Sequence, residues 1–460
     1  MHEHRHRAAA LLCLWGIALP SAHAASDMDI ASLRAEFETQ LRSLRETYEG
    51  RLRELEARLA KTDAEVARAS HEPPAAASGG GSAFNPEISL ILQGRFAEGA
   101  TGDRRPTGFL TDAGGEGPAR GFSLDDTELI LSANIDPDFR GLANLVLADG
   151  QAEVEEAWFQ TQSLGSGVTL KGGRFISGIG YQNEQHPHAW DFADNTLMYR
   201  TLFGEHFIQD GLQLKWLAPT ETFVELGAEI GRGASFPGSE DGGGLNGAGA
   251  WALFGHVGGD VGEDSAWRAG LSYLGARPKA RESILPDLGG VDTLSAFTGA
   301  SHTWIADFVW KWAPAGNARD QAFKFQTEYF RRDEHGSLLC DDADPATPSL
   351  CAGGSPGAYR ARQSGVYVQG VYQFMPRWRL GLRYDRLDSG SLDYGANNAF
   401  LPTAAYHPNK WSLMADYAPS EFSLFRLQFS RDHAQRGEPD DSQVTLQYVY
   451  SLGPHGAHKF

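Results

Sequence analysis

The feature that most constrains this chain is a repeated segment of about ten residues in which apolar and polar side chains alternate. From Phe84 to the C-terminus these segments follow one another, and no helical pattern is sustained between them. Within residues 212–216, for example, Leu212, Leu214 and Trp216 alternate with polar side chains. A strand places successive side chains on opposite faces, so each segment is predicted to be a β-strand with one apolar and one polar face.

The connections between these segments decide the class of fold, because a water-soluble β-sandwich alternates in the same way. Short turns that follow an aromatic residue, as at Trp312-Ala313-Pro314, alternate with much longer connections rich in Gly, Asp and Ser. The long connections cover residues 233–247, 278–300, 333–362 and 388–407. Such alternation is typical of outer-membrane barrels, whose two rims carry short turns and long loops. We therefore predict an all-β fold, an antiparallel transmembrane β-barrel.

The same pattern predicts sixteen strands. They are residues 87–97, 122–134, 140–148, 152–162, 167–175, 207–217, 222–232, 249–260, 266–276, 301–312, 321–332, 363–374, 377–387, 409–418, 422–432 and 442–452. An even number leaves both ends of the barrel on the periplasmic side. A barrel of this size keeps a water-filled lumen, so we expect a pore for passive diffusion of small hydrophilic solutes or ions.

The first 24 residues are predicted to be a signal peptide. Arg5 and Arg7 precede the apolar stretch 8–19, and Ala22-His23-Ala24 fits a cleavage site. Export places the mature chain outside the cytoplasm.

Residues 25–70 are predicted to form an α-helical coiled coil in the periplasm. Apolar residues recur from Ile30 to Leu59 in steps of three, four and four, an eleven-residue period that keeps one narrow stripe on a helix. We favour self-association through this stripe, and a single amphipathic helix lying on its own domain is the alternative. Residues 71–84 then read as a flexible linker, which leaves 85–460 for the barrel.

Charge and motifs exclude several classes of function. The chain has 40 Lys and Arg against 59 Asp and Glu, a formal charge of -19, which disfavours nucleic acid as a partner. It lacks the apolar runs of roughly 18 residues that helical membrane proteins need. It also lacks the GxSxG, HExxH and P-loop motifs, and we expect no enzymatic activity.

Cys340 and Cys351 are the only cysteines that remain after Cys13 is removed with the signal peptide. In an oxidising compartment a lone pair is predicted to form a disulfide bond. Metal binding by the pair is the weaker alternative, because neither a CxxC spacing nor a nearby His supports it.

Three segments carry a resemblance to a known family. Asn85–Gly94, Gly173–Tyr181 and Ser451–Phe460 resemble a porin-like subgroup sometimes labelled zinc-regulated outer-membrane receptors. The order of signal peptide, short periplasmic coiled coil and sixteen-stranded barrel resembles the wider group, the O and P type phosphate-selective porins of Gram-negative outer membranes. We expect the coiled coil and the barrel wall to hold several copies together in outer-membrane lipid, and the resemblance implies that the number is three, a homotrimer. Docking of the coiled coil to the cell wall is the alternative. The terminal aromatic Phe460 is typical of proteins that the outer-membrane assembly machinery recognises.

The resemblance also implies that the third outer loop, residues 176–206, folds inward and narrows the pore. Its acidic residues exceed its single Arg by three charges, which predicts a preference for cations. The candidate constriction residues are Glu184, His186, His188, Asp191, Asp194, Arg200, Glu205 and His206.

This loop also holds candidate metal ligands, although no cofactor is required for a pore. Imidazole and carboxylate groups suit zinc, copper or nickel, and the candidates are Glu184, His186, His188 and His206. Ordinary loop histidines bonded to the wall are the alternative. A receptor or specific channel for a metal ion or phosphate also stays open. Phosphate selection is expected to need ladders of Arg and clusters of Lys along the lumen, and Arg residues that pair with lumen carboxylates and brace the wall are the alternative.

Overall fold

The computed structural model describes residues 86–99, 105–111, 120–148, 151–240 and 248–453. The chain divides into two units, residues 1–82 and 83–460. The predicted signal peptide, coiled coil and linker, and Phe460, lie outside the described residues.

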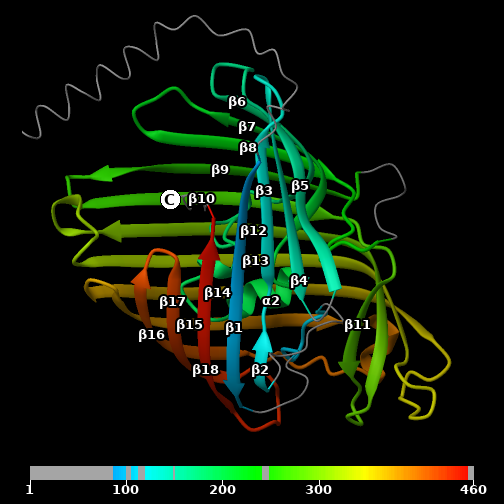
Figure 1. Ribbon diagram of the computed structural model, residues 1–460. Helices are drawn as coiled ribbons and strands as arrows, with labels where there is room; N and C mark the ends of the chain where they lie inside the picture. The colour runs from blue at the N-terminus through cyan, green and yellow to red at the C-terminus, as the bar shows by residue number, and fades with distance from the viewer. Residues whose placement is uncertain (1–85, 100–104, 112–119, 149–150, 241–247, 454–460) are drawn as a thin grey trace, which may run out of the picture. The chain divides into compact units, whose positions relative to one another are not determined.

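The second unit is a single antiparallel sheet that closes on itself, because its first strand β1 pairs with its last strand β18 (Figure 1). The strands are β1 (Glu87–Glu98), β2 (Gly121–Leu124), β3 (Thr127–Asn134), β4 (Phe139–Ala148), β5 (Gln151–Thr161), β6 (Val168–Ile176), β7 (Ile208–Leu217), β8 (Phe223–Gly231), β9 (Ala250–Val261), β10 (Ser265–Ala276), β11 (Arg281–Pro286), β12 (Asp292–Trp312), β13 (Ala322–Asp342), β14 (Ser355–Met375), β15 (Trp378–Asp393), β16 (Asn409–Ser420), β17 (Ser423–His433) and β18 (Asp441–Leu452).

In two cases, a pair of these strands occupies a single strand position in the wall. β2 and β3 pair with successive parts of β1, and β10 and β11 pair with successive parts of β12. The wall is therefore a closed barrel of sixteen strands, which confirms the predicted number. The segment predicted as one strand over 122–134 is interrupted at Asp125 and Asp126.

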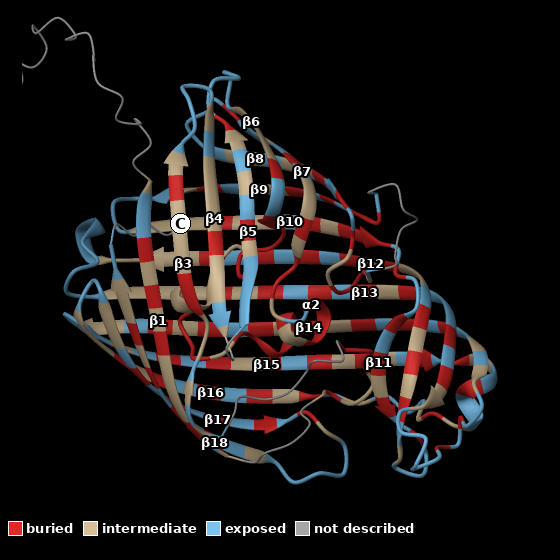
Figure 2. Ribbon diagram, turned by 45° about the vertical axis from the view of Figure 1, so that its right-hand side comes forward, coloured by how far each residue is buried: buried red, intermediate tan, exposed pale blue. Residues whose placement is uncertain are grey.

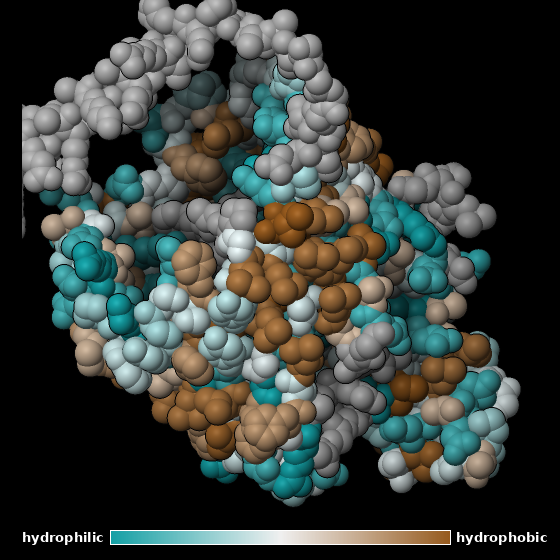
Figure 3. Space-filling view, viewed as in Figure 1, coloured by the Kyte–Doolittle hydropathy of each residue, from teal (hydrophilic) through white to brown (hydrophobic). Residues whose placement is uncertain are grey.

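Buried and exposed residues alternate along the wall strands, as the sequence pattern predicts (Figure 2), and many of the exposed residues are large and apolar. On β9, Trp251, Leu253 and Val257 are exposed on the outside, while Phe254 and His256 are buried inside. Figure 3 shows part of the apolar outer surface over β1 and β3. Because β1 pairs with β18, the sheet has no free edge strand, and such a closed wall can face lipid. Neither α2 (Leu197–Phe203) nor the short 3-10 segments of the described residues have the length and apolarity of a membrane-spanning helix.

Three strands extend well beyond the barrel at the long-loop end. β12, β13 and β14 each have 21 residues, so the predicted loops 278–300 and 333–362 are partly strand. The extension forms because Phe297, Leu338 and Tyr359 keep the alternation going and bury a second apolar core.

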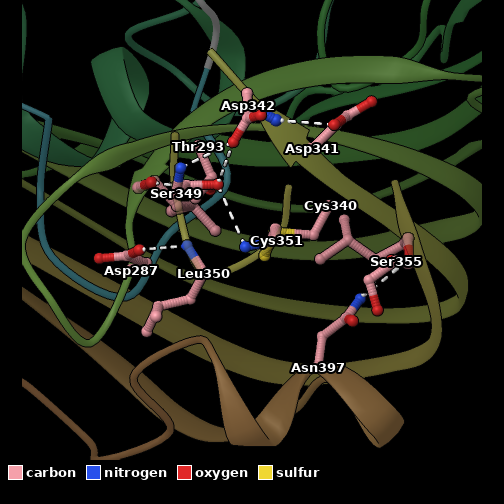
Figure 4. Close-up of a disulfide and its surroundings, with 12 residues drawn as sticks. Asp287, Thr293, Cys340, Asp341, Asp342, Ser349, Leu350, Cys351, Ser355 and Asn397 are labelled. Atoms are coloured by element: carbon pink, nitrogen blue, oxygen red, sulfur yellow. Dashed lines mark hydrogen bonds between the residues drawn. A yellow bond between two sulfur atoms is a disulfide. The ribbon is translucent and has the colours of Figure 1, made fainter. Parts of the chain in front are cut away.

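The predicted disulfide between Cys340 and Cys351 is confirmed and lies in this second core (Figure 4). Asp342 receives hydrogen bonds from the backbone N–H of Ser349 at 2.7 Å and from its hydroxyl at 2.8 Å. The bridge and these bonds fold the β13–β14 connection back onto the extension.

The described part of the first outer connection, residues 105–111, reaches across to the far wall. The carbonyl of Gly108 accepts a hydrogen bond from Gln363 on β14 at 2.7 Å, and the carbonyl of Thr111 accepts one from Ser283 on β11 at 2.7 Å. Phe109 is buried in the core within the barrel. This segment therefore covers part of the mouth at the long-loop end.

Candidate functional site

The connection between β6 and β7, residues 177–207, lies inside the barrel rather than above it. Its backbone N–H groups donate hydrogen bonds to inward-facing side chains on widely separated strands. These bonds run from Gly178 to Glu229 on β8 (2.9 Å), Gln182 to Glu328 on β13 (2.8 Å), Leu197 to Asp385 on β15 (3.0 Å) and Ala193 to Gln428 on β17 (2.8 Å). Because these strands are spread around the wall, the third loop crosses the lumen. Figures 1 and 2 both show α2 within the ring of strands.

The local sequence explains the shape of the loop. Pro187 begins the 3-10 segment Pro187–Ala189, where a fixed φ is favourable. The hydroxyl of Thr196 caps α2 by accepting from the N–H of Tyr199 at 3.3 Å. Gly204 ends the helix with a φ of 66°, a left-handed conformation that glycine adopts without strain.

Helix α2 packs its apolar side chains against the inner wall. Phe203 lies 5.4 Å from Phe330 on β13, ring centroid to ring centroid, and Tyr199 lies 5.0 Å from the same ring. Leu202 and Met198 are completely buried in the same core. This core joins the loop to the inner wall and fixes helix α2 inside the barrel.

Glu328 on β13 fixes the loop at this core. Its carboxylate accepts hydrogen bonds from the backbone N–H groups of Tyr181 (3.3 Å) and Gln182 (2.8 Å) and from the hydroxyls of Tyr199 (2.8 Å) and Tyr367 (2.7 Å). Glu328 cannot be recognised from the sequence, because a single acidic residue at an inward-facing position of a strand carries no distinguishing signal.

Asp191, a predicted constriction residue, forms ion pairs with the wall. Its carboxylate lies 2.9 Å from Lys324 Nζ on β13 and 3.2 Å from Arg379 Nη1 on β15. Burial alone would raise the pKa of Asp191, but the charges of Lys324 and Arg379 outweigh burial and lower that pKa to about 2.

Asp194 makes a second set of ion pairs on the same sector. Its carboxylate contacts Arg383 Nη2 on β15 at 2.9 Å, Lys410 Nζ on β16, and Gln428 Nε2 on β17 at 2.8 Å. Burial opposes the charged form, yet Lys410 and Arg383 dominate and hold the pKa of Asp194 far below its ordinary value.

The other two acidic residues of the loop are also paired. Glu184 lies 3.9 Å from Lys215 Nζ and 3.7 Å from Arg268 Nη2, and Glu205 lies 3.7 Å from Arg200 within the loop. The expected excess of three negative charges is thus matched by cations of the wall. Arg268, Arg379 and Arg383 of the wall thus pair with carboxylates of the loop, and these acidic residues attach the loop to the wall.

His186 and His188 face a different sector, formed by acidic residues of β3 and β5. The two rings stack with centroids 5.7 Å apart. His186 Nδ1 lies 3.2 Å from Glu155 Oε2 and 3.5 Å from Glu128 Oε2, and His186 Nε2 lies 3.3 Å from Glu156 Oε2. Burial alone would lower the pKa of His186, but the bonds to Glu155 and Glu156 raise it well above its ordinary value.

The other two predicted metal ligands do not join this group. Glu184 is paired with wall cations as above, and His206 donates a hydrogen bond from Nδ1 to the carbonyl of Asn183 in its own loop at 3.0 Å. His206 also packs on Trp190, and burial lowers its pKa. The Glu residues of β3 and β5 that complete the group were missed, because they lie about 30 to 60 residues from the loop in sequence.

Comparison with known proteins gives one relative by sequence and several by fold. No family model matches the chain. An uncharacterized protein of Aquifex aeolicus (strain VF5) is 30% identical over 406 residues, which cover 82% of this chain and 80% of that protein.

Among solved structures, Pseudomonas putida OprB, in a high-pH structure, matches with a TM-score of 0.50 and 12% identity over 80% of this chain and 94% of OprB. An anion-selective porin from Comamonas acidovorans matches 80% of this chain and 99% of its own, with a TM-score of 0.45 and 9% identity. The likeness to OprB shows that the fold is of the outer-membrane barrel type.

Proposed function

The chain belongs to the same family as the Aquifex aeolicus protein, and we propose that it is an outer-membrane porin through which small hydrophilic solutes or ions diffuse passively. One observation carries this proposal: a closed sixteen-stranded barrel holds its third loop across the lumen, attached to several sectors of the wall. Such a loop narrows a water-filled path without closing it by a separate domain. Diffusion through it requires neither a covalent step nor an energy source.

The distribution of charge supports a modest preference for cations. On the sector of β13 to β17, loop carboxylates and wall cations offset one another. On the sector of β3 to β5, three carboxylates, Glu128, Glu155 and Glu156, face the two imidazoles of the loop. We place the cation path beside this second sector, and the predicted constriction residues His186 and His188 border it.

A phosphate-specific channel is less well supported. A cavity of about 730 Å³ at the short-turn end is lined by Lys311, Lys324 and Arg379. The same cavity is lined by four acidic residues, Asp191, Asp260, Glu263 and Asp264. Since the acidic groups offset the basic ones, the cavity offers no concentrated positive charge for an anion.

The proposal includes the assembly that the sequence predicts. After export and cleavage of residues 1–24, the barrel inserts into the outer membrane of a Gram-negative bacterium with the help of the assembly machinery that recognises Phe460. The coiled coil at 25–70 and the barrel wall then hold a homotrimer together, with the coiled coil in the periplasm.

The direct test is the current through a planar lipid bilayer that contains the purified mature protein, measured with a tenfold gradient of potassium chloride. We expect stepwise currents and a reversal potential that indicates cation preference. Glu155→Gln should reduce that preference, whereas Glu282→Gln, the same change on the exposed face of β11, should not. The absence of any conductance would refute the proposed function, and an anion preference would refute the charge argument.

A further inference from the structure

We infer that Glu128, Glu155 and His186 form a binding site for one divalent transition-metal ion, of which zinc fits best. One ligand atom from each residue lies within 4.8 Å of the other two. The three residues come from β3, β5 and the third loop, so a bound ion would join the loop to the wall. The site goes beyond the proposed porin function and stands independently of it.

The distances already match those between ligands of one metal ion. Zinc binds imidazole nitrogen and carboxylate oxygen at roughly 2.0–2.2 Å, so neighbouring ligand atoms of a tetrahedron lie about 3.3–3.6 Å apart. His186 Nδ1 is 3.2 Å from Glu155 Oε2 and 3.5 Å from Glu128 Oε2. Little rearrangement is therefore needed for both carboxylates and the imidazole to share one ion.

The other nitrogen of His186 is arranged as in known metal sites. A histidine that binds metal through one nitrogen donates its other N–H to a carboxylate or carbonyl, which orients the ring. His186 Nε2 lies 3.3 Å from Glu156 Oε2. Glu156 is held in turn by the indole N–H of Trp158 and the backbone N–H of Ile176, both at 3.1 Å.

Glu128 and Glu155 are also held in place by neighbours. His188 Nδ1 lies 2.6 Å from Glu128 Oε1, which leaves Glu128 Oε2 facing His186. Asn144 Nδ2 donates to Glu128 Oε2 at 3.2 Å and to Glu155 Oε2 at 2.8 Å. The Oδ1 atom of the buried Asn144 finds no hydrogen-bond partner among the described residues. Rotation of this amide would turn Oδ1 toward the same two carboxylates, an orientation that only a cation between them would stabilise.

The charge of the cluster gives an independent reason for a cation. A neutral imidazole has one N–H, yet both nitrogens of His186 face carboxylates. The ring therefore needs either an added proton or a metal ion on Nδ1. A divalent ion offsets the three carboxylates better than one proton does, and Glu128 is completely buried, where an unbalanced charge is costly.

The donor set selects the kind of metal. Calcium and magnesium prefer shells made of oxygen alone, whereas imidazole mixed with carboxylate suits zinc, nickel or copper. Three protein ligands leave a fourth position for water or a passing group. The site is reachable from the lumen, because the side chains of His186 and Glu155 keep 21% and 13% of their surface exposed.

The test is isothermal titration of the full mature chain, folded in detergent and freed of metal by a chelator, with zinc chloride. We expect one zinc per chain. His186→Asn and Glu155→Gln should each weaken binding at least tenfold, because loss of even a partner that only orients a ligand weakens metal binding by about 10–100-fold. His206→Asn is the matched control, since it removes a buried histidine of the same loop outside the cluster, and it should leave binding unchanged.

Folding of each variant is checked by its resistance to unfolding in detergent, and a measurement on the unaltered chain removes any dependence on variants. Cobalt chloride should give the visible absorption of a four-coordinate site with nitrogen and oxygen ligands, and zinc should abolish it. No saturable zinc binding, or unchanged binding by a folded His186→Asn protein, would overturn the inference. Zinc binding without conductance would refute only the porin function, and conductance without zinc binding would refute only the metal site.

Discussion

Replacing Asp194 with Asn should loosen the third loop rather than simply remove a charge from the pore. Asp194 contacts Arg383 and Lys410, whose side chains are only 1% and 2% exposed. Removing one partner of a buried pair leaves an uncompensated charge and costs about 3–5 kcal/mol. Because the Asp194 side chain is 19% exposed, we expect the lower end, about 3 kcal/mol. That cost shifts the balance between attached and detached loop by roughly 150-fold.

The assay combines single-channel recording with limited proteolysis of the folded barrel. Asp194→Asn channels should show excursions to higher conductance and cleavage within residues 177–207. A second change, Lys410→Met, removes one of the two buried charges, Arg383 and Lys410, that Asp194→Asn leaves unpaired. It should therefore reduce the excursions to higher conductance. Asp194 would instead line the ion path as a filter if Asp194→Asn kept the original conductance and protease resistance while its reversal potential moved toward that of an anion-selective pore.

Three further predictions concern the other attachments. The pKa of Asp191 is about 2, below its ordinary value of 3.8, so its ion pairs contribute about 2 kcal/mol to holding the loop above pH 4, and this contribution is lost as the pH falls toward 2. Channel noise should rise across that pH range, and noise that does not change with pH would contradict the role of Lys324. Glu328→Gln keeps the size but removes two of the acceptor positions used by four donors, and should weaken the loop by about 1–3 kcal/mol, measured as faster proteolysis; unchanged proteolysis would remove Glu328 from the anchor. Reduction of Cys340–Cys351 should lower thermal stability by a few degrees, consistent with about 3 kcal/mol for a short closed loop, while the reversal potential stays the same; an altered reversal potential would place the disulfide at the ion path.

The barrel could be predicted from the sequence because its determinants are local. Alternation within a strand, such as Leu212 to Trp216, and the rhythm of short and long connections need only neighbouring residues. The disulfide followed from the number of cysteines. The outer extension was predicted as loop because Gly, Asp and Ser are frequent in 333–362, although Leu338 and Tyr359 pack into a core there.

The contacts of the third loop could not be predicted, because they depend on strand register and on the direction in which each side chain faces. From the sequence, Asp191 and Asp194 are predicted to form an acidic filter. In the structure they contact Lys324 and Lys410, which lie more than 130 residues away in the sequence. Glu128, Glu155 and Glu156 could not be predicted for the same reason, since their contacts with the loop also depend on strand register and side-chain direction. A lumen carboxylate on a strand looks like any other polar residue of an alternating pattern, so only the folded barrel reveals which ones meet.

The loop is held on separate sectors of the wall by different chemistry, and this explains why it can lie inside a wide barrel. Buried ion pairs attach Asp191 and Asp194 to the sector of β13 to β17. The imidazole groups of His186 and His188 contact carboxylates in the sector of β3 to β5. Between the two, the apolar side chains of α2 are buried and Glu328 accepts backbone hydrogen bonds. A loop fixed on one sector alone would be free to hinge, so the two sets of attachments depend on each other, and their effects on the width of the pore are coupled rather than additive. Occupancy of the His186 site by a metal ion would therefore influence the pore not by blocking it but by determining how firmly the opposite end of the same loop is held.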